Sequence, residues 1–150
     1  MINLRDCSLE PSDDGPTGHR FRSLHPAREL GAKRTGFGVY ELDPGQATWP
    51  YHFELGSEEW LLVIEGEVVV RTPDGELTLH PGDVMCFPEG PAGAHGIRND
   101  SGTVARFAMP SVDEPAGAAI YPDSGKLLVY GPGFRHRGWI GDEVEYWEGE

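Results

Sequence analysis

Turn-forming residues interrupt this chain so densely that long helices are excluded. Twenty-one glycines and thirteen prolines fall mostly between short runs of other residues, and no amphipathic stretch of helical period is longer than about two turns. The runs between them predict eight strands, at 35–42, 47–55, 58–65, 67–71, 76–80, 83–87, 94–98 and 103–109. Short strands at this spacing predict an all-β sandwich or barrel.

The length of the chain fits one domain with an arm at each end. With 150 residues and a mass of 16.4 kDa, it can bury a core without a structural metal or disulfides. We expect a loose leader over residues 1–19, a barrel over 20–110 in which 20–24 adds an edge strand, and a C-terminal arm over 111–150. The arm is acidic but contains aromatic residues, so we expect it to pack on the barrel or on a dimer partner.

Charge and composition limit the possible partners. The net charge of −13 and the scattered lysines and arginines leave no basic stripe for nucleic acid. The longest purely apolar run, Trp60 to Ile64, is too short for a membrane span, and the N-terminus lacks the apolar region of a signal peptide. Two cysteines, Cys7 and Cys86, do not make a disulfide framework. We therefore expect a cytoplasmic protein whose partner is a small molecule.

The segment PYHFELGSEEW crowds three glutamates around a histidine in strand-like sequence. By strand alternation His52 and Glu54 point to one face, and in the next strand Glu59 shares its face with Leu61 while Glu58 points the other way. Pairing across the short turn can bring His52, Glu54 and one of the two later glutamates together. Burying such carboxylates is costly unless a charge compensates them, so the segment indicates a divalent cation.

Two spaced motifs span the central part of the chain. The first, from Gly45 to Gly66, reads G-x6-HFE-x4-E-x6-G, and the second, from Gly82 to Asn99, reads G-x5-PEG-x4-H-x3-N. Both resemble the paired motifs of the cupin superfamily, and the rest of the chain resembles small bacterial single-domain cupins. Two departures stand out: Glu54 occupies the place of a second histidine, and the loop before His95 is two residues longer.

The cupin resemblance implies a fold and a ligand set. It implies a double-stranded β-helix, or jelly-roll barrel, with His52, Glu59 and His95 as metal ligands. Glu54 is then either a further ligand or a free group that moves a proton. Two imidazoles with carboxylates and an open position suit iron, manganese, nickel or zinc. We expect Glu58 to be a charge on the rim of the site.

Three functions are compatible with such a site. The first is a metal-dependent dioxygenase-like oxidoreductase, the second a metal-assisted isomerase, lyase or cyclase, and the third a non-catalytic module that binds a small ligand. Four other histidines are expected to be structural: His19, His25, His80 and His136. We expect Phe107 and Met109 to point into the barrel. Two roles are open to the arm aromatics, a lid over the barrel or a homodimer interface, and we expect the interface: Tyr121, Trp139 and Trp147.

Overall fold

The computed structural model describes residues 1–12, 15–112 and 114–149, and its regular structure is almost entirely β. The one helical element in these ranges is the 3-10 turn η1 (Pro91–Gly93). Accordingly, no helix in the described part of the chain has the length and apolar character needed to cross a membrane. The prediction of an all-β fold without long helices is confirmed.

One wall of the molecule is a six-stranded antiparallel sheet in the order β1-β2-β3-β10-β5-β8. Its strands are β1 (Glu10–Pro11), β2 (Arg22–Leu24), β3 (Thr35–Leu42), β10 (Ala105–Val112), β5 (Glu59–Glu65) and β8 (Val84–Phe87). β10 pairs with β3 along its whole length and with β5 on its other side. It therefore lies at the centre of this wall.

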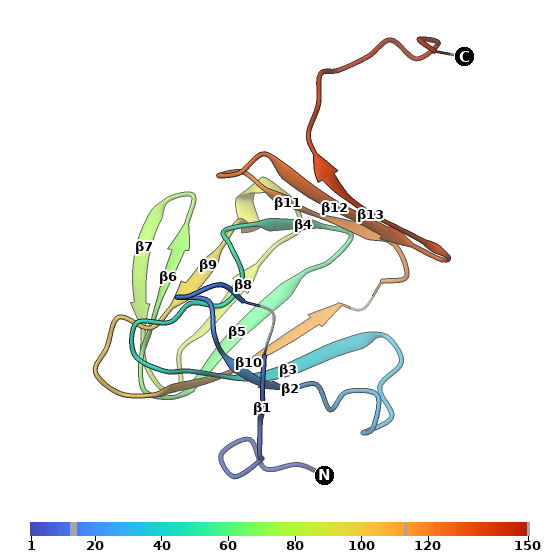
Figure 1. Ribbon diagram of the computed structural model, residues 1–150. Helices are drawn as coiled ribbons and strands as arrows, with labels where there is room; N and C mark the ends of the chain where they lie inside the picture. The colour runs from blue at the N-terminus through green and yellow to red at the C-terminus, as the bar shows by residue number, and fades with distance from the viewer. Residues whose placement is uncertain (13–14, 113, 150) are drawn as a thin grey trace.

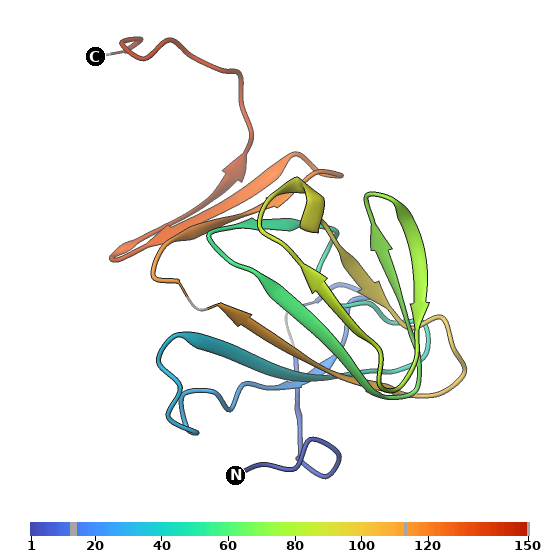
Figure 2. The ribbon, with the colours of Figure 1, turned by 180° about the vertical axis from the view of Figure 1, so that it is seen from behind.

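The opposite wall consists of two smaller sheets that meet at the candidate site. Their strands are β4 (Phe53–Leu55), β6 (Val68–Thr72), β7 (Gly75–Leu79), β9 (Gly96–Arg98), β11 (Gly117–Tyr121), β12 (Lys126–Gly131) and β13 (Phe134–Trp139). One sheet has the order β7-β6-β9 and the other β13-β12-β11-β4. Isolated bridges, one of them between His52 and His95, connect the two. Figures 1 and 2 show the four-stranded sheet lying across one end of the molecule, opposite the N-terminus.

The core lies between the two walls and follows from strand alternation. Its buried members are Tyr40, Leu42, Leu61, Val63, Val68, Val70, Phe87, Ile97, Ala105, Phe107 and Met109. The inward orientation expected for Phe107 and Met109 is thereby confirmed. Because these residues come from strands of both walls, the core fixes the walls relative to each other and so positions the side chains between them.

The C-terminal third contains three strands that are not among the eight predicted from the sequence. β11, β12 and β13 form a meander that pairs through β11 with β4, in the register Ala118 with Leu55. The alternation of apolar and polar residues that predicts a strand is weak here, because β12 (KLLVYG) is apolar on both faces and half-buried throughout. Strand prediction also failed over 47–55, where β4 covers only Phe53–Leu55, since Pro50 has no N–H for a continuous ladder.

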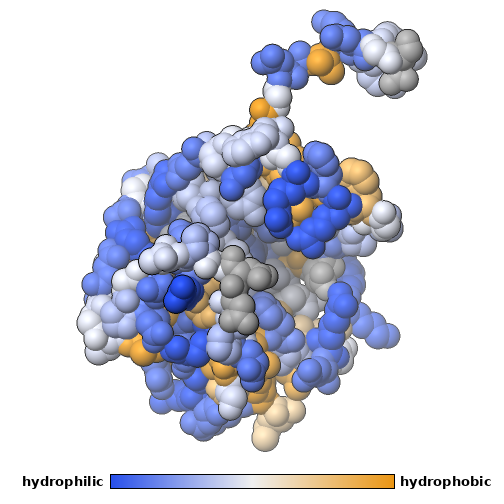
Figure 3. All heavy atoms as spheres, viewed as in Figure 1, coloured by the Kyte–Doolittle hydropathy of each residue, from blue (hydrophilic) through white to orange (hydrophobic). Residues whose placement is uncertain are grey.

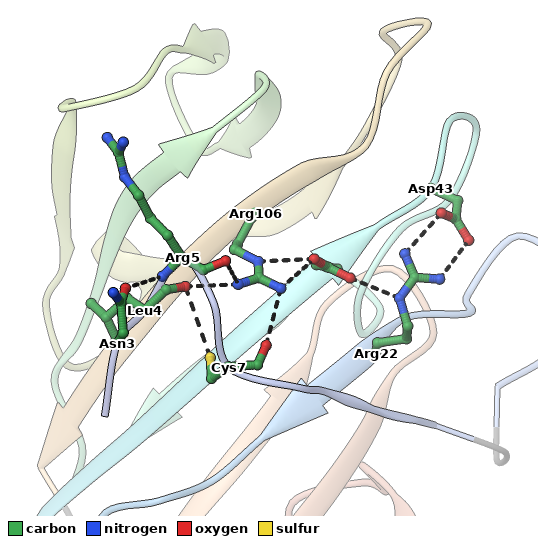
Figure 4. A network of polar contacts seen from close by, with 8 residues as sticks. Asn3, Leu4, Arg5, Cys7, Arg22, Asp43 and Arg106 are labelled. Atoms are coloured by element: carbon green, nitrogen blue, oxygen red, sulfur yellow. Dashed lines mark hydrogen bonds and ion pairs between the residues drawn. The ribbon is translucent and has the colours of Figure 1, made fainter. Parts of the chain in front are cut away.

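The N-terminal segment is held on the barrel by a buried arginine (Figure 4). The Arg106 guanidinium, on a residue only 9% exposed, donates hydrogen bonds to the carbonyl oxygens of Leu4 and Cys7 at 2.9 and 3.2 Å. It also pairs with Glu41 at 2.6 Å, and Glu41 pairs with Arg22 at 2.8 Å. The expected loose leader therefore has fixed contacts before β1, which itself pairs with β2.

Candidate metal centre

His52 and His95 face each other across the junction of the two smaller sheets. Each backbone N–H donates to the carbonyl oxygen of the other residue, at 3.0 Å for His52 and 2.8 Å for His95. Both residues are buried, with exposed fractions of 7% and 3%. Their rings lie 4.9 Å apart between centroids. The backbone ladder thus places two imidazoles side by side.

Backbone carbonyls fix the orientation of both imidazoles. The Nδ1 of His52 lies 2.9 Å from the carbonyl oxygen of Pro50, and the Nδ1 of His95 lies 2.9 Å from that of Gly93. Because a carbonyl oxygen only accepts, each Nδ1 must carry the proton, and each Nε2 keeps a free lone pair. This is the usual arrangement of metal-binding histidines, in which the second nitrogen donates to a carbonyl or carboxylate.

The longer loop between the second motif's glycine and its histidine builds part of this support. Residues 91–93 of this loop form η1, and the Gly90 N–H donates to the carbonyl oxygen of Glu54 at 2.8 Å. A side chain at Gly93 would collide with the carbonyl of Pro88, so only glycine fits there. The Gly93 carbonyl then orients His95. The two extra residues in this loop are therefore compatible with the orientation of His95.

Glu59, the first residue of β5, reaches the histidines from the opposite wall. Its Oε2 lies 3.5 Å from the Nε2 of His95, and one ligand atom from each of His52, Glu59 and His95 lies within 4.8 Å of the others. Two nitrogens and one carboxylate oxygen at this separation suit a divalent transition ion and leave other coordination positions open.

The electrostatics of the three side chains also fit a cation. Burial and the neighbouring charge of Glu54 raise the pKa of Glu59 to about 7, and a nearby cation would oppose both effects. Burial and the adjacent His52 lower the pKa of His95 to about 4, and burial lowers that of His52. Both imidazoles are therefore neutral at pH 7, as metal ligands must be.

Glu54 lies beside this cluster without joining it. The three residues that converge are His52, Glu59 and His95, and Glu54 is not among them. It is half-buried on β4, burial raises its pKa, and its charge acts on Glu59. Ligation by Glu54 stays a prediction. Glu58 is exposed and accepts a hydrogen bond from the Trp60 indole at 3.0 Å, as expected for a residue on the rim.

Three aromatic residues lie around the cluster, and none of them is assigned to it from the sequence. Phe87 stacks on His95 with ring centroids 3.8 Å apart. Tyr121 stacks on His52 with ring centroids 5.6 Å apart, so it lies against a candidate ligand, and its expected place in a dimer interface stays a prediction. Tyr40 is buried, and burial together with the charge of Glu59 raises its pKa. Gly38 is the feature of the sequence that points to this position of Tyr40, because the absence of a side chain there leaves space for the Tyr40 hydroxyl.

Comparisons with known proteins agree with this architecture. Residues 38–110 match the Cupin domain family. A protein from Acidithiobacillus ferrooxidans, provisionally assigned as a sugar phosphate isomerase, superposes with a TM-score of 0.85 at 20% identity over 97% of this chain and 93% of its own. A sugar phosphate isomerase of the cupin superfamily from Silicibacter pomeroyi gives 0.81 at 22% identity, with 97% of each chain covered.

A third solved structure is more similar in sequence over a shorter region. It is a Thermus thermophilus protein with 36% identity and a TM-score of 0.51, over 56% of this chain and 77% of its own. No protein with a curated description matches the sequence significantly. Fold and site together define a small jelly-roll barrel with a candidate metal centre between its walls. The chain belongs to the Cupin domain family over residues 38–110, as its motifs indicated.

Proposed function

We propose that this protein is a metal-dependent enzyme that isomerises a small oxygen-bearing substrate. The observation that carries the proposal is the convergence of His52, Glu59 and His95 with a separate carboxylate, Glu54, next to them. The three converging residues would hold an iron, manganese, nickel or zinc ion. Such an ion, when bound, polarises a carbonyl or hydroxyl oxygen of the substrate as a Lewis acid.

Glu54 is the proton-transfer group in this proposal. Its side chain points to the same face as His52 because the two are two residues apart in an extended segment. A carboxylate in that place can take a proton from the carbon beside a carbonyl and return it to the neighbouring carbon, which is the proton balance of an aldose–ketose exchange. The Nδ1 protons of His52 and His95 are committed to backbone carbonyls. Glu59 would be a metal ligand, so Glu54 is the carboxylate left for proton transfer.

Dioxygenation is the second candidate. It is favoured by the number of converging ligands, since two imidazoles and one carboxylate leave several positions open for oxygen and substrate. In that reaction Glu54 would orient the substrate or deprotonate one of its hydroxyl groups. The two candidates differ in whether the substrate reacts without oxygen.

Anaerobic purification with elemental analysis, followed by proton NMR in deuterated water, tests both candidates. Sugar phosphates are the first substrates to try, because two structural neighbours bear the name of sugar phosphate isomerases. We expect deuterium to enter the carbon beside the carbonyl without oxygen. Glu54→Ala should keep the metal and lose the exchange, whereas the rim variant Glu58→Ala should keep both.

Other results would contradict the proposal. Substrate-dependent oxygen uptake with no exchange under anaerobic conditions would favour dioxygenation. Full exchange in Glu54→Ala would remove Glu54 from the mechanism. A wild-type protein that takes up none of the four metals would leave only the binding of a small ligand.

A further inference from the structure

The face of the four-stranded sheet that carries His52 and Glu54 continues beyond them onto β12 and β13. In the sheet register Glu54 lies opposite Ala119, Ala119 opposite Leu128, and Leu128 opposite Arg137. Directly opposite residues of neighbouring strands point to the same face. Arg137 therefore projects from the same surface as Glu54, at the other edge of the sheet.

Two more cations lie on this face. Tyr121, which stacks on His52, pairs with Lys126, and the Lys126 ammonium lies 5.7 Å from the centre of the Tyr121 ring. Arg135 is two residues before Arg137 in β13, so strand alternation gives it the same orientation. We call Lys126, Arg135 and Arg137 the basic row. Figure 3 shows strongly hydrophilic side chains gathered over β12 and β13.

Tyr121 connects the basic row to the candidate site. It stacks on His52, its cross-strand partner is Lys126, and Arg135 and Arg137 lie on the next strand, β13. The site has an anionic end, at Glu54 and Glu59, and a cationic end.

No carboxylate in the described part of the chain neutralises the basic row. Within residues 1–12, 15–112 and 114–149, Lys126, Arg135 and Arg137 form no ion pair, although the chain has 25 acidic and only 12 basic residues. Both arginines are exposed. Guanidinium groups without a carboxylate partner are suited to bidentate recognition of phosphate and carboxylate.

We propose that the basic row binds the anionic group of the substrate, a phosphate or carboxylate, while the reacting oxygen lies at the His52, Glu59 and His95 cluster. The proposal rests on the proposed function. Three inter-strand steps of about 4.8 Å, roughly 14 Å in all, separate β4 from β13. The long side chains of Glu54 and of the arginines shorten this gap from both ends to the length of a small metabolite.

The acidic C-terminal segment of a second copy is the competing occupant. It carries Asp142, Glu143, Glu145 and Glu148, and it leaves the body directly after β13 (Figure 1). A small anion is favoured because the basic row shares its face with the candidate metal ligands, where a segment of another chain would bury the site.

Titration of the metal-free full-length protein with inorganic phosphate at low salt tests the proposal. Isothermal calorimetry should show binding that weakens about tenfold in Arg135→Gln and in Arg137→Gln, the loss expected for one charge-assisted hydrogen bond. Arg5→Gln is the matched control. It removes the same charge at the opposite end of the molecule, where the Arg5 side chain points away from the network in Figure 4. It should bind phosphate like the wild type.

A parallel titration with acetate separates the two anion chemistries. Weakened binding of either anion in both arginine variants, with the Arg5→Gln control unchanged, supports the proposal and names the group. Equal affinity in the wild type and both arginine variants would overturn it. Phosphate binding that appears only after Glu143→Gln and Glu145→Gln would also overturn it, because the acidic segment would then be the occupant.

Metal content separates this inference from the proposed function. Elemental analysis of Arg135→Gln and Arg137→Gln should match the wild type, because neither side chain belongs to the converging cluster. A wild-type protein that binds phosphate at the basic row but takes up no metal would contradict the proposed function alone. Normal metal uptake with no response of phosphate binding to the arginine variants would contradict this inference alone.

Discussion

Backbone carbonyls accept the Nδ1 hydrogen bonds of both candidate histidine ligands. The carbonyls of Pro50 and Gly93 fix which nitrogen of each imidazole carries the proton. A backbone acceptor is insensitive to side-chain substitution unless the substitution moves the loop. The geometry of the cluster therefore depends on the conformation around residues 50 and 93 as much as on the ligands.

The choice between two adjacent glutamates gives a first prediction. Glu59→Ala should abolish metal uptake because Glu59 supplies the one carboxylate of the converging cluster. Glu58→Ala should leave metal uptake nearly unchanged, since Glu58 is exposed and bonded to the Trp60 indole. Elemental analysis of both variants checks this. Equal loss in the two, or the reverse order, would show that the orientation of this strand is wrong.

Gly38 allows a second prediction at the same scale. A methyl group at this position would collide with the Tyr40 hydroxyl. Gly38→Ala should therefore displace the Tyr40 ring from Phe107, on which it stacks at 5.5 Å, and lower the free energy of unfolding by about 1–3 kcal/mol. Urea denaturation measures this, with Gly102→Ala as the control because a methyl group there meets open space. An unchanged Gly38→Ala protein would contradict the packing described for Tyr40.

At the scale of elements, one ion-pair network ties the N-terminal segment to three strands. Glu41 on β3 accepts hydrogen bonds from Arg106 on β10 and from Arg22 on β2, each at 2.8 Å. Burial would raise the pKa of Glu41, but these two hydrogen bonds outweigh burial and hold it below its usual value. A carboxylate with a lowered pKa stabilises the fold above its unfolded pKa and loses that contribution as the pH falls.

Glu41→Gln tests this contribution. At neutral pH the variant should be less stable than the wild type by about 2 kcal/mol, because Arg106 and Arg22 lose a charged partner. The difference should shrink as the pH falls below the usual carboxyl value of 4.5 and the wild-type carboxylate takes up a proton. Urea denaturation over a pH series measures it. Asp74→Asn, in an exposed turn, should show no such difference, and a gap between wild type and Glu41→Gln that is independent of pH would contradict the network.

At the scale of the whole molecule, the C-terminal end exposes several large apolar side chains. Trp139 and Trp147 are 72% and 76% exposed, and Phe134 on the edge strand β13 is 59% exposed. Residues 140–149 extend away from the body (Figure 2). An uncovered edge strand is also a template for pairing with another chain. A homodimer that covers these residues remains our proposal.

Light scattering on the full chain tests the dimer. We expect a dimeric mass that shifts toward the monomer in the double variant Tyr146→Ser, Trp147→Ser, because both aromatic rings would lose apolar burial. Leu30→Ser, which removes an exposed apolar side chain from an N-terminal turn, should keep the dimer. A wild-type monomer that persists at high concentration would contradict the proposal.

The sequence by itself determined the fold class and the three converging residues. Turn residues and strand alternation act over a few positions, so they are readable locally. The resemblance of the two motifs to those of cupins singles out His52, Glu59 and His95, with Glu54 as a further candidate. Glu59 could be chosen over Glu58 because a step of one residue in a strand reverses the face to which a side chain points.

Only the tertiary structure decided what lies around those residues. The pairing of β4 with β11 joins segments far apart in the chain, and it alone places Tyr121 against His52 and the basic row on the face of Glu54. The contact of Arg106 with residues 4–7 and the position of the Tyr40 hydroxyl over Gly38 are likewise long-range or packing effects. Local sequence carries no record of such partners, because their stability comes from surfaces that exist only after the chain has folded.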